Sequence, residues 1–382
     1  MRSVKEIPHL ENIPVLVRAS LNAPVEDGRV TNDYRLRRAL PTINFLREKH
    51  ARIVLIGHAG DHGTETLLPI YEALKRHIPN LAFCPTSVGP EARAAVRDLR
   101  SGGVLMLENL RRHKGEKEND VGFACELAEL ADVFVQDSFD VCHRKHASVI
   151  GVPSFLPSYA GLQVEEEVRQ LTRALTPQHP SLAVIGGAKF STKQPILEKL
   201  LDSYDKVFVG GALANDFMVE LGYGVGTSLV STDSDKAALH ALRTNPRLML
   251  PLDEVVAPAG SHEDDVDEQV VALDAVPKDM AILDDGPETV AALGELAASA
   301  KTILWNGPLG NYEKGFEEAT EAFAKHVANS KAYSVVGGGD TVAAIEKLSI
   351  SDRVSFISTG GGAMLDFMAE GTLPGLEVLE QA

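Results

Sequence analysis

Four glycine-rich segments stand in the second half of the chain, each directly after a short apolar run. They are residues 186–189 (GGAK), 210–211 (GG), 337–341 (GGGDT) and 358–362 (STGGG). In an open α/β sheet, ligands bind at the carboxyl ends of the strands, and glycine there lets a phosphate approach backbone N–H groups at a helix N-terminus. A single loop of this kind could be only a tight turn. Four together predict a nucleotide or polyphosphate site.

Charged residues accompany these loops. Asp340 suits Mg²⁺ shared with phosphate oxygens, because Mg²⁺ favours one or two carboxylates plus phosphates. The same aspartate also fits a helix N-cap, and both roles are compatible. Lys189 and Lys193 stand four residues apart, so both ammonium groups can face phosphates if the loop enters a helix; the alternative is solvated surface charge.

Other nucleotide-binding signatures are missing from the sequence. No segment reads GxxxxGK[ST], and none reads GxGxxG with an acidic residue about 20 positions further on. The protein-kinase signature set is absent as well. The sequence therefore disfavours a P-loop protein, a dinucleotide dehydrogenase and a protein kinase.

Cationic residues gather in the first half, where fifteen of the twenty arginines precede residue 162. Arg18, Arg35, Arg111 and Arg144 each follow a predicted strand or open a predicted helix, and His58, His143 and His146 have similar positions. Arginine forks suit carboxylate and phosphate groups. The run 143–146 (HRKH) in an otherwise acidic chain favours an anionic ligand, although a lone histidine is more often a structural residue.

Strands and helices alternate along the chain. Apolar runs typical of buried parallel strands are 14–17, 52–56, 104–107, 133–135, 182–185, 206–209, 302–304, 333–336 and 354–357. Helical spacing covers 35–49, 67–77, 120–131, 194–201, 317–329 and 341–348. This order predicts an α/β fold with two Rossmann-like parallel-sheet domains, each a three-layer α/β/α arrangement.

The boundary between the two domains lies near residue 161. Residues 151–161 are rich in Pro, Gly and Ser and are predicted to form a loop. Residues 162–175 have the pattern of one amphipathic helix, ended by Pro177 and Pro180. We therefore expect an N-terminal domain over 1–160, a hinge helix over 161–176 and a C-terminal domain over 177–369.

Composition excludes several classes of protein. A chain of 382 residues exceeds the usual size of a single core, and its net charge of −17 makes nucleic acid and anionic membranes poor partners. No apolar run reaches membrane-spanning length, and the N-terminus has no hydrophobic signal core. Three scattered cysteines suit a reducing compartment, so we expect a cytoplasmic protein.

At these motifs the chain resembles the phosphoglycerate kinase family over nearly its whole length. The segments that carry the resemblance in the first half are RASLNAP (18–24), GHAGDH (57–62), MLENLRR (106–112) and QDSFDVCHRKHAS (136–148). Those in the second half are GGAKFSTK (186–193), LDDGPET (283–289), WNGPLGNYE (305–313), GGGDT (337–341) and STGGGA (358–363). Motifs of this length in this order make chance similarity very unlikely.

The resemblance implies a monomeric two-domain enzyme of glycolysis and gluconeogenesis that moves the acyl phosphate of 1,3-bisphosphoglycerate to ADP, giving 3-phosphoglycerate and ATP. The N-terminal domain would bind the acid and the C-terminal domain would bind Mg²⁺ with ATP or ADP, while residues 370–382 would return to the first domain. The small molecules would be the only partners. Closure about the hinge would expel water from the reacting groups.

Residue by residue, the resemblance implies three sets of functional positions. Phosphoryl transfer would involve Arg35, Lys189, Gly338 and Gly361. The acid would be bound by Arg18, Ser20, Asn22, Arg35, His58, Asp61, Arg111, His143 and Arg144. The nucleotide would be bound by Gly187, Lys189, Lys193, Gly211, Asn306, Glu313, Gly338, Gly339, Asp340 and Thr341, with Asp340 also holding the metal.

Departures from the family pattern concentrate on the acid side. Ser20 replaces the usual aspartate, Asp61 replaces a substrate-binding arginine and Asp140 replaces a usual glycine. Asp61 places an anion near an anionic ligand, and the nearby cations Arg112, Lys145, Arg37 and Arg38 could compensate. Two alternatives therefore stay open: a related phosphotransferase with a different acid substrate, and a catalytically silent nucleotide-binding module.

Overall fold

The computed structural model describes residues 1–381 apart from 189, 233–234 and 263–267. The chain divides into a first unit, Met1–Arg169 with Thr372–Ala382, and a second unit, Gln170–Gly371. Each unit is built on its own six-stranded sheet, and every strand pair in both sheets is parallel. The predicted α/β class with two parallel-sheet domains is confirmed.

In the first unit the strand order is β5-β6-β4-β1-β7-β8. The strands are β1 (Pro14–Ala19), β4 (Arg52–Ile56), β5 (Ala82–Cys84), β6 (Val104–Leu107), β7 (Val133–Asp137) and β8 (Ser158–Ala160), with a separate hairpin of β2 (Val25–Glu26) and β3 (Arg29–Val30). The helices are α1 (Tyr34–Glu48), α2 (Leu68–Leu74), α3 (Gly89–Asp98), α4 (Lys114–Glu118) and α5 (Val121–Ala128).

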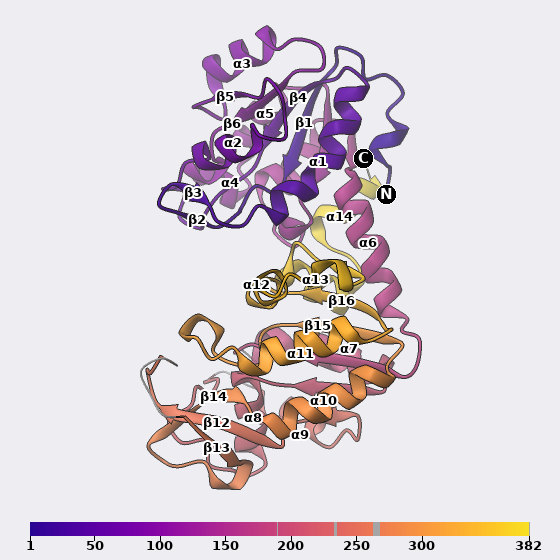
Figure 1. The fold of residues 1–382 in the computed structure, drawn as a ribbon. Helices are drawn as coiled ribbons and strands as arrows, with labels where there is room; N and C mark the ends of the chain where they lie inside the picture. Colours follow the sequence, from indigo (N-terminus) through magenta and orange to yellow (C-terminus); the bar gives the residue numbers. More distant parts are fainter. Residues whose placement is uncertain (189, 233–234, 263–267, 382) are drawn as a thin grey trace. The chain divides into compact units, whose positions relative to one another are not determined.

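Helices cover both faces of this sheet (Figure 1). Successive side chains of a strand point to opposite faces, so one strand contributes to two cores. Along β1, Val15 and Val17 belong to one core with residues of α1 and α2, whereas Leu16 belongs to another with residues of α3 and α5. Burial on both sides explains why these strands are uniformly apolar.

In the second unit the strand order is β11-β10-β9-β15-β16-β17. These strands are β9 (Ser181–Ile185), β10 (Lys206–Val209), β11 (Leu248–Met249), β15 (Thr302–Asn306), β16 (Tyr333–Gly337) and β17 (Phe356–Ile357). The helices are α7 (Phe190–Ser203), α8 (Ala212–Glu220), α9 (Lys236–Arg243), α10 (Pro287–Ser299), α11 (Glu318–Asn329), α12 (Gly339–Lys347) and α13 (Gly361–Glu370).

A second, antiparallel sheet in this unit was not foreseen from the sequence. It consists of β12 (Asp253–Pro258) between β13 (Gln269–Ala272) and β14 (Met280–Asp285). The edge strand β13 has mostly exposed side chains, so its sequence carries no buried apolar signal. Its strand β14 runs into the acidic LDDGPET segment (283–289).

Two helices lie where the chain passes from one unit to the other. α6 (Leu162–Leu175) has the predicted bounds, and its residues are shared between the two units. α14 (Pro374–Gln381) belongs to the first unit, where the amide of Gly375 donates to the carbonyl of Cys142 at 2.8 Å and Leu376 and Leu379 are buried. None of the helices in the described part of the chain has the length and apolar character needed to cross a bilayer.

Several predicted elements need correction. The segment 151–161, predicted as a loop, contains β8, which hydrogen-bonds to β7 and completes the sheet at its edge. The predicted helix 67–77 ends at Leu74, ahead of Pro79, and the helix 120–131 starts after Asp120, whose carboxylate caps it by accepting from the amide of Phe123 at 2.8 Å. The predicted strand 354–357 is reduced to β17.

Candidate active site

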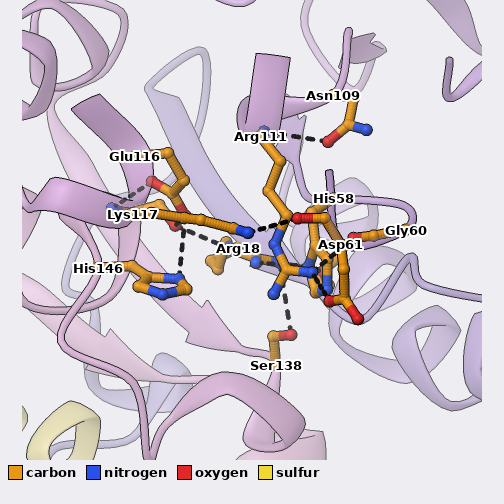
Figure 2. A network of polar contacts seen from close by, with 12 residues as sticks. Arg18, His58, Gly60, Asp61, Asn109, Arg111, Glu116, Lys117, Ser138 and His146 are labelled. Atoms are coloured by element: carbon orange, nitrogen blue, oxygen red, sulfur yellow. Dashed lines mark hydrogen bonds and ion pairs between the residues drawn. The ribbon is translucent and has the colours of Figure 1, made fainter. Parts of the chain in front are cut away.

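The carboxyl edge of the first sheet gathers the cationic residues. Arg18 lies at the end of β1, His58 follows β4, Arg111 follows β6 and Arg144 follows β7. Parallel strands end at the same edge, so residues far apart in sequence meet there. Figure 2 shows Arg18, His58 and Arg111 with the polar side chains around them.

Arg18 is the fixed centre of this group, with only 1% of its surface exposed. Its Nε donates to Ser148 Oγ at 3.0 Å, its Nη1 to the carbonyl of Ala19 at 2.8 Å, and its Nη2 to His58 Nδ1 at 2.9 Å. Burial lowers the pKa of Arg18, while the carboxyl groups of Glu116 and Asp140 act in the opposite direction. These contacts hold the guanidinium in one orientation.

His58 is held neutral. Its burial, followed by the charge of Arg18, keeps its pKa well below the ordinary value. Arginine has no acceptor, so Nδ1 of His58 must accept the bond from Arg18 and the ring proton must lie on Nε2. His58 therefore offers a neutral N–H donor to a ligand rather than a second positive charge.

Glu116, on α4, is a buried partner that the sequence did not reveal. It accepts from the amide of Ser148 at 3.0 Å and from Ser148 Oγ at 2.6 Å, and its Oε1 lies 3.9 Å from His146 Nδ1. Burial, with the positive charges of Arg111 and Arg18, lowers the pKa of His146 to about 4. At neutral pH His146 is therefore uncharged, and the charge of Glu116 acts on Arg18, which shares the hydroxyl of Ser148 with it.

Arg111 is paired with Asp61. Its Nη1 lies 2.6 Å from Asp61 Oδ1, and the same nitrogen donates to the carbonyl of Gly60. Lys117 Nζ donates to the backbone carbonyl of Asp61 (Figure 2). The Arg111 side chain is 8% exposed and that of Asp61 is 83% exposed. The loop after β4 thus places its own carboxylate on an arginine predicted to bind substrate.

Two of the four cations expected to compensate for Asp61 have other partners. Arg112 Nη1 lies 3.2 Å from Glu108 Oε2, and Arg37 Nε lies 2.8 Å from Asp33 Oδ1. This corrects the expectation for these two arginines: each is neutralised by a neighbour on its own turn of chain. Arg111 is the group that meets the charge of Asp61.

Asn22 joins the loop after β1 to the loop after β4. Its carbonyl accepts from Arg35 Nη1 at 2.8 Å, and its Oδ1 accepts from the amide of Gly60 at 3.0 Å. Arg35 lies on the first turn of α1, half-buried, whereas Arg144 is exposed and His143 is intermediate. The acid-side residues of the first unit therefore include both fixed and solvent-facing cations.

The second unit has a cavity of about 470 Å³. Four residues predicted to bind nucleotide line it: Gly187, Gly211, Glu313 and Asp340. Its wall also includes residues that sequence reasoning missed, among them Leu229, Asp284 and Tyr312. Asp284 reaches this wall from β14 of the antiparallel sheet, whereas Leu229 and Tyr312 come from other segments of the chain.

The two glycines predicted to act in transfer lie against each other. A Cβ on Gly361 would stand 2.8 Å from the Cα of Gly338, so a larger residue at position 361 would push the two loops apart. Gly338 has φ +101°, which favours glycine. Asn306 Nδ2 donates to the carbonyl of Gly361 at 3.2 Å, linking the end of β15 to the same point.

Charged and polar groups surround these loops. Burial lowers the pKa of Lys193 to about 8, opposed by Asp366. Burial, followed by the charge of Glu313, raises the pKa of Asp340. Thr341 Oγ1 is buried and lacks a hydrogen-bond partner within the described part of the chain. The predicted Lys189 lies outside the described residues.

Not every predicted nucleotide-binding residue lines the cavity. Lys193, Asn306, Gly338, Gly339 and Thr341 are absent from its wall. They lie instead on α7, at the end of β15 and at the start of α12. The described residues contain no cluster of three or more His, Cys, Asp or Glu side chains that could hold a metal ion by themselves.

Comparison with known proteins decides the family. A sequence model of phosphoglycerate kinase matches residues 4–371. The chain belongs to the phosphoglycerate kinase family. The phosphoglycerate kinase of Moorella thermoacetica is 42% identical over 97% of both chains, and that of Thermus thermophilus is 43% identical over 96% of both.

Solved structures agree with this family assignment. The phosphoglycerate kinase from Coxiella burnetii covers 99% of this chain and 98% of its own with a TM-score of 0.82 and 38% identity. That from Pyrococcus horikoshii covers 100% and 98% with a TM-score of 0.88 and 30% identity. The chain is therefore an enzyme of glycolysis, a phosphotransferase with a carboxyl group as acceptor and a nucleotide as substrate. A different acid or a silent binding module is not favoured.

Proposed function

We propose that this chain transfers the acyl phosphate of 1,3-bisphosphoglycerate reversibly to ADP, with the first unit binding the acid and the second binding the nucleotide. The observation that carries the proposal is the group of Arg18, His58 and Arg111 at one edge of the first sheet, in a chain of net charge −17. Positive charge gathered locally in an acidic protein fits a ligand with several negative charges.

The acid-side residues have distinct roles in this proposal. Arg111 presents a planar fork that matches carboxylate and phosphate oxygens. Arg18 is buried and already bonded through Nε, Nη1 and Nη2, so it contributes fixed positive charge beside the ligand. His58 donates from Nε2 without adding charge. Asn22 links the two loops through Gly60, Arg144 extends the positive surface toward solvent, and His143 adds a half-buried polar group beside it.

Transfer needs positioning and charge stabilisation rather than a general base, because a carboxylate oxygen is itself the acceptor or the leaving group. The transferring phosphoryl group spreads charge over its equatorial oxygens. Arg35 and Lys189 would stabilise that charge, and the backbone N–H groups beside Gly338 and Gly361 would receive the oxygens. We propose α6 as the hinge that lets the two substrates meet.

The residues near Asp340 fit a metal that arrives with the nucleotide. Burial, followed by the charge of Glu313, raises the pKa of Asp340, and a bound cation would favour its ionised form. Thr341 Oγ1 is a buried oxygen without a partner in the described part of the chain. One carboxylate plus phosphates is a usual Mg²⁺ environment. Bound Mg²⁺ would neutralise phosphate charge, while Lys193, Gly187 and Gly211 hold the nucleotide.

We further propose that the chain works as a cytoplasmic monomer on small molecules, without nucleic acid. The acidic net charge supports the absence of nucleic acid, since it opposes association with phosphate backbones and anionic lipids.

Substitution of Arg35 tests the proposal. Arg35→Ala should abolish most turnover of 3-phosphoglycerate with Mg-ATP while leaving Mg-ATP binding, measured by calorimetry, unchanged. Arg37→Ala is the matched control on the same helix, because Arg37 pairs with Asp33 on the surface. Equal activity of the Arg35 variant and the control would contradict the assigned role.

A further inference from the structure

Two of the residues that depart from the family pattern touch each other. Ser20, at the end of β1, and Asp140, after β7, are 120 positions apart, yet Ser20 Oγ donates to Asp140 Oδ1 at 2.7 Å. The resemblance gives an aspartate at the first position and a glycine at the second. The negative charge missing at residue 20 is thus present at residue 140, within hydrogen-bond reach.

We infer that Asp140 recognises the hydroxyl group of the acid substrate, and that the Ser20–Asp140 pair is a relocated carboxylate rather than a loss of function. The inference rests on the proposed function, since it names one contact within the same acid site. In this proposal the carboxylate that is absent at residue 20 is supplied by residue 140.

The geometry leaves one oxygen of Asp140 for a ligand. Ser138 Oγ donates to Oδ1 at 2.6 Å, and Ser20 Oγ donates to the same oxygen. Within the described part of the chain, Oδ2 has no hydrogen-bond partner. Asp140 is half-buried, so part of the residue is open to solvent, and neither serine contact uses Oδ2.

The charge around Asp140 fixes its orientation. Arg18 Nη1 donates to Ser138 Oγ at 3.5 Å, and the same hydroxyl donates to the carboxylate of Asp140, so Ser138 bridges the two charged groups. The charge of Asp140 also acts to raise the pKa of Arg18, against the effect of burial. Asp140 is therefore anchored beside the cations that would hold the substrate anions.

The chemistry of the ligand then limits what Asp140 can bind. 3-Phosphoglycerate carries a phosphate, a carboxylate and one hydroxyl group. An ionised carboxylate repels the first two and accepts only from the third. Arg111 binds the anionic groups beside the fixed charge of Arg18, and Asp140 binds the hydroxyl.

The first test is a comparison of two acids. Wild-type chain, Asp140→Ala and Asp140→Asn are assayed with 3-phosphoglycerate and with 3-phosphooxypropanoate, which lacks the hydroxyl. Wild type should prefer the hydroxy acid by at least tenfold in kcat/KM, and Asp140→Ala should bring that preference close to one. Asp132→Ala, at the opposite end of β7, is the matched control and should keep the preference. Equal losses for both acids in Asp140→Ala would overturn the inference.

The second test exchanges the two residues. Asp140→Gly alone should lower kcat/KM for 3-phosphoglycerate about tenfold. Ser20→Asp alone should lower it as well, because two carboxylates would then stand at hydrogen-bond distance. The double variant restores the family pattern and should recover to within about threefold of wild type. A double variant no better than the worse single one would overturn the inference.

Calorimetric binding of both acids separates this inference from the proposed function. Suppose the chain shows no turnover, yet binds 3-phosphoglycerate better than 3-phosphooxypropanoate and loses this preference in Asp140→Ala. That result would contradict the proposed activity and still support the contact between Asp140 and the hydroxyl group. Unfolding midpoints of the variants identify any that fail to fold. If Asp140→Ala fails to fold, Asp140→Asn takes its place in the comparison, because its amide oxygen can still accept from both serines.

Discussion

Asp61 pairs with Arg111, which we propose binds the acid substrate, so removing the charge of Asp61 should tighten substrate binding. In the free enzyme its carboxylate lies 2.6 Å from Arg111 Nη1. An incoming phosphate or carboxylate must displace this internal anion before it can use the same guanidinium. Asp61→Asn keeps the size of the side chain and removes the charge.

The size of the effect follows from exposure and distance. An exposed ion pair contributes about 0.2–1 kcal/mol. The short contact and the 8% exposure of the Arg111 side chain place this pair near the upper limit, while the 83% exposure of Asp61 keeps it from exceeding it. Repulsion between Asp61 and the bound anion adds up to about 1 kcal/mol at water-like screening. A total of about 1–2 kcal/mol corresponds to roughly 5–30-fold.

The assay is ATP-dependent phosphorylation of 3-phosphoglycerate over a range of acid concentrations, with calorimetric binding of the acid as a second measurement. Asp61→Asn should lower KM and Kd for the acid about 5–30-fold, and the difference from wild type should shrink at high salt. Asp98→Asn, an exposed carboxylate at the end of α3, is the control. An unchanged or raised KM would refute the displacement argument and show that the loop depends on Asp61.

Two further predictions concern the second unit. Gly361→Ala should lower kcat at least tenfold with little change in KM for ATP, because its Cβ would meet Gly338 at 2.8 Å; Gly224→Ala, with open space around it, should leave steady-state kinetics unchanged. Burial raises the pKa of Asp284 to about 8. The folded state therefore keeps a proton that the unfolded state releases near pH 4. Because the folded state binds more protons, the stability that this group contributes falls as pH rises from about 4 to 8. Asp284→Asn should therefore flatten the decline in the free energy of unfolding between pH 5 and 8. Unfolding can be monitored by the fluorescence of Trp305, the single tryptophan. An unchanged slope in the variant would contradict the assignment of this pH dependence to Asp284.

The fold was largely predictable because its strands are apolar on both faces. Runs such as Arg52–Ile56 and Lys206–Val209 stand out from the polar segments around them, and their order with helices between them predicts parallel sheets. In the antiparallel sheet, the edge strand Gln269–Ala272 escaped prediction because it is short and mostly exposed. The strands Asp253–Pro258 and Met280–Asp285 are mostly buried, but acidic residues shorten their apolar runs. Periodicity indicates an element only where one side of it is buried.

The candidate site was predictable as a collection of residues but not as a network. The carboxyl edge of a parallel sheet determines that Arg18, His58 and Arg111 come together. It does not determine that Asp61 turns onto Arg111 or that Ser20 meets Asp140, because these contacts depend on loop conformations set by the tertiary structure. Glu116 carried no sequence signal either, since a buried carboxylate is indistinguishable from a surface one in a polar segment.

The most direct test of the account is steady-state turnover of the unmodified chain with Mg-ATP and 3-phosphoglycerate, coupled to a reporter of 1,3-bisphosphoglycerate. The account predicts saturable turnover with both substrates required, since Arg111 remains available once Asp61 is displaced and Asp140 supplies the missing carboxylate. Absence of turnover in a folded chain that binds Mg-ATP would contradict it.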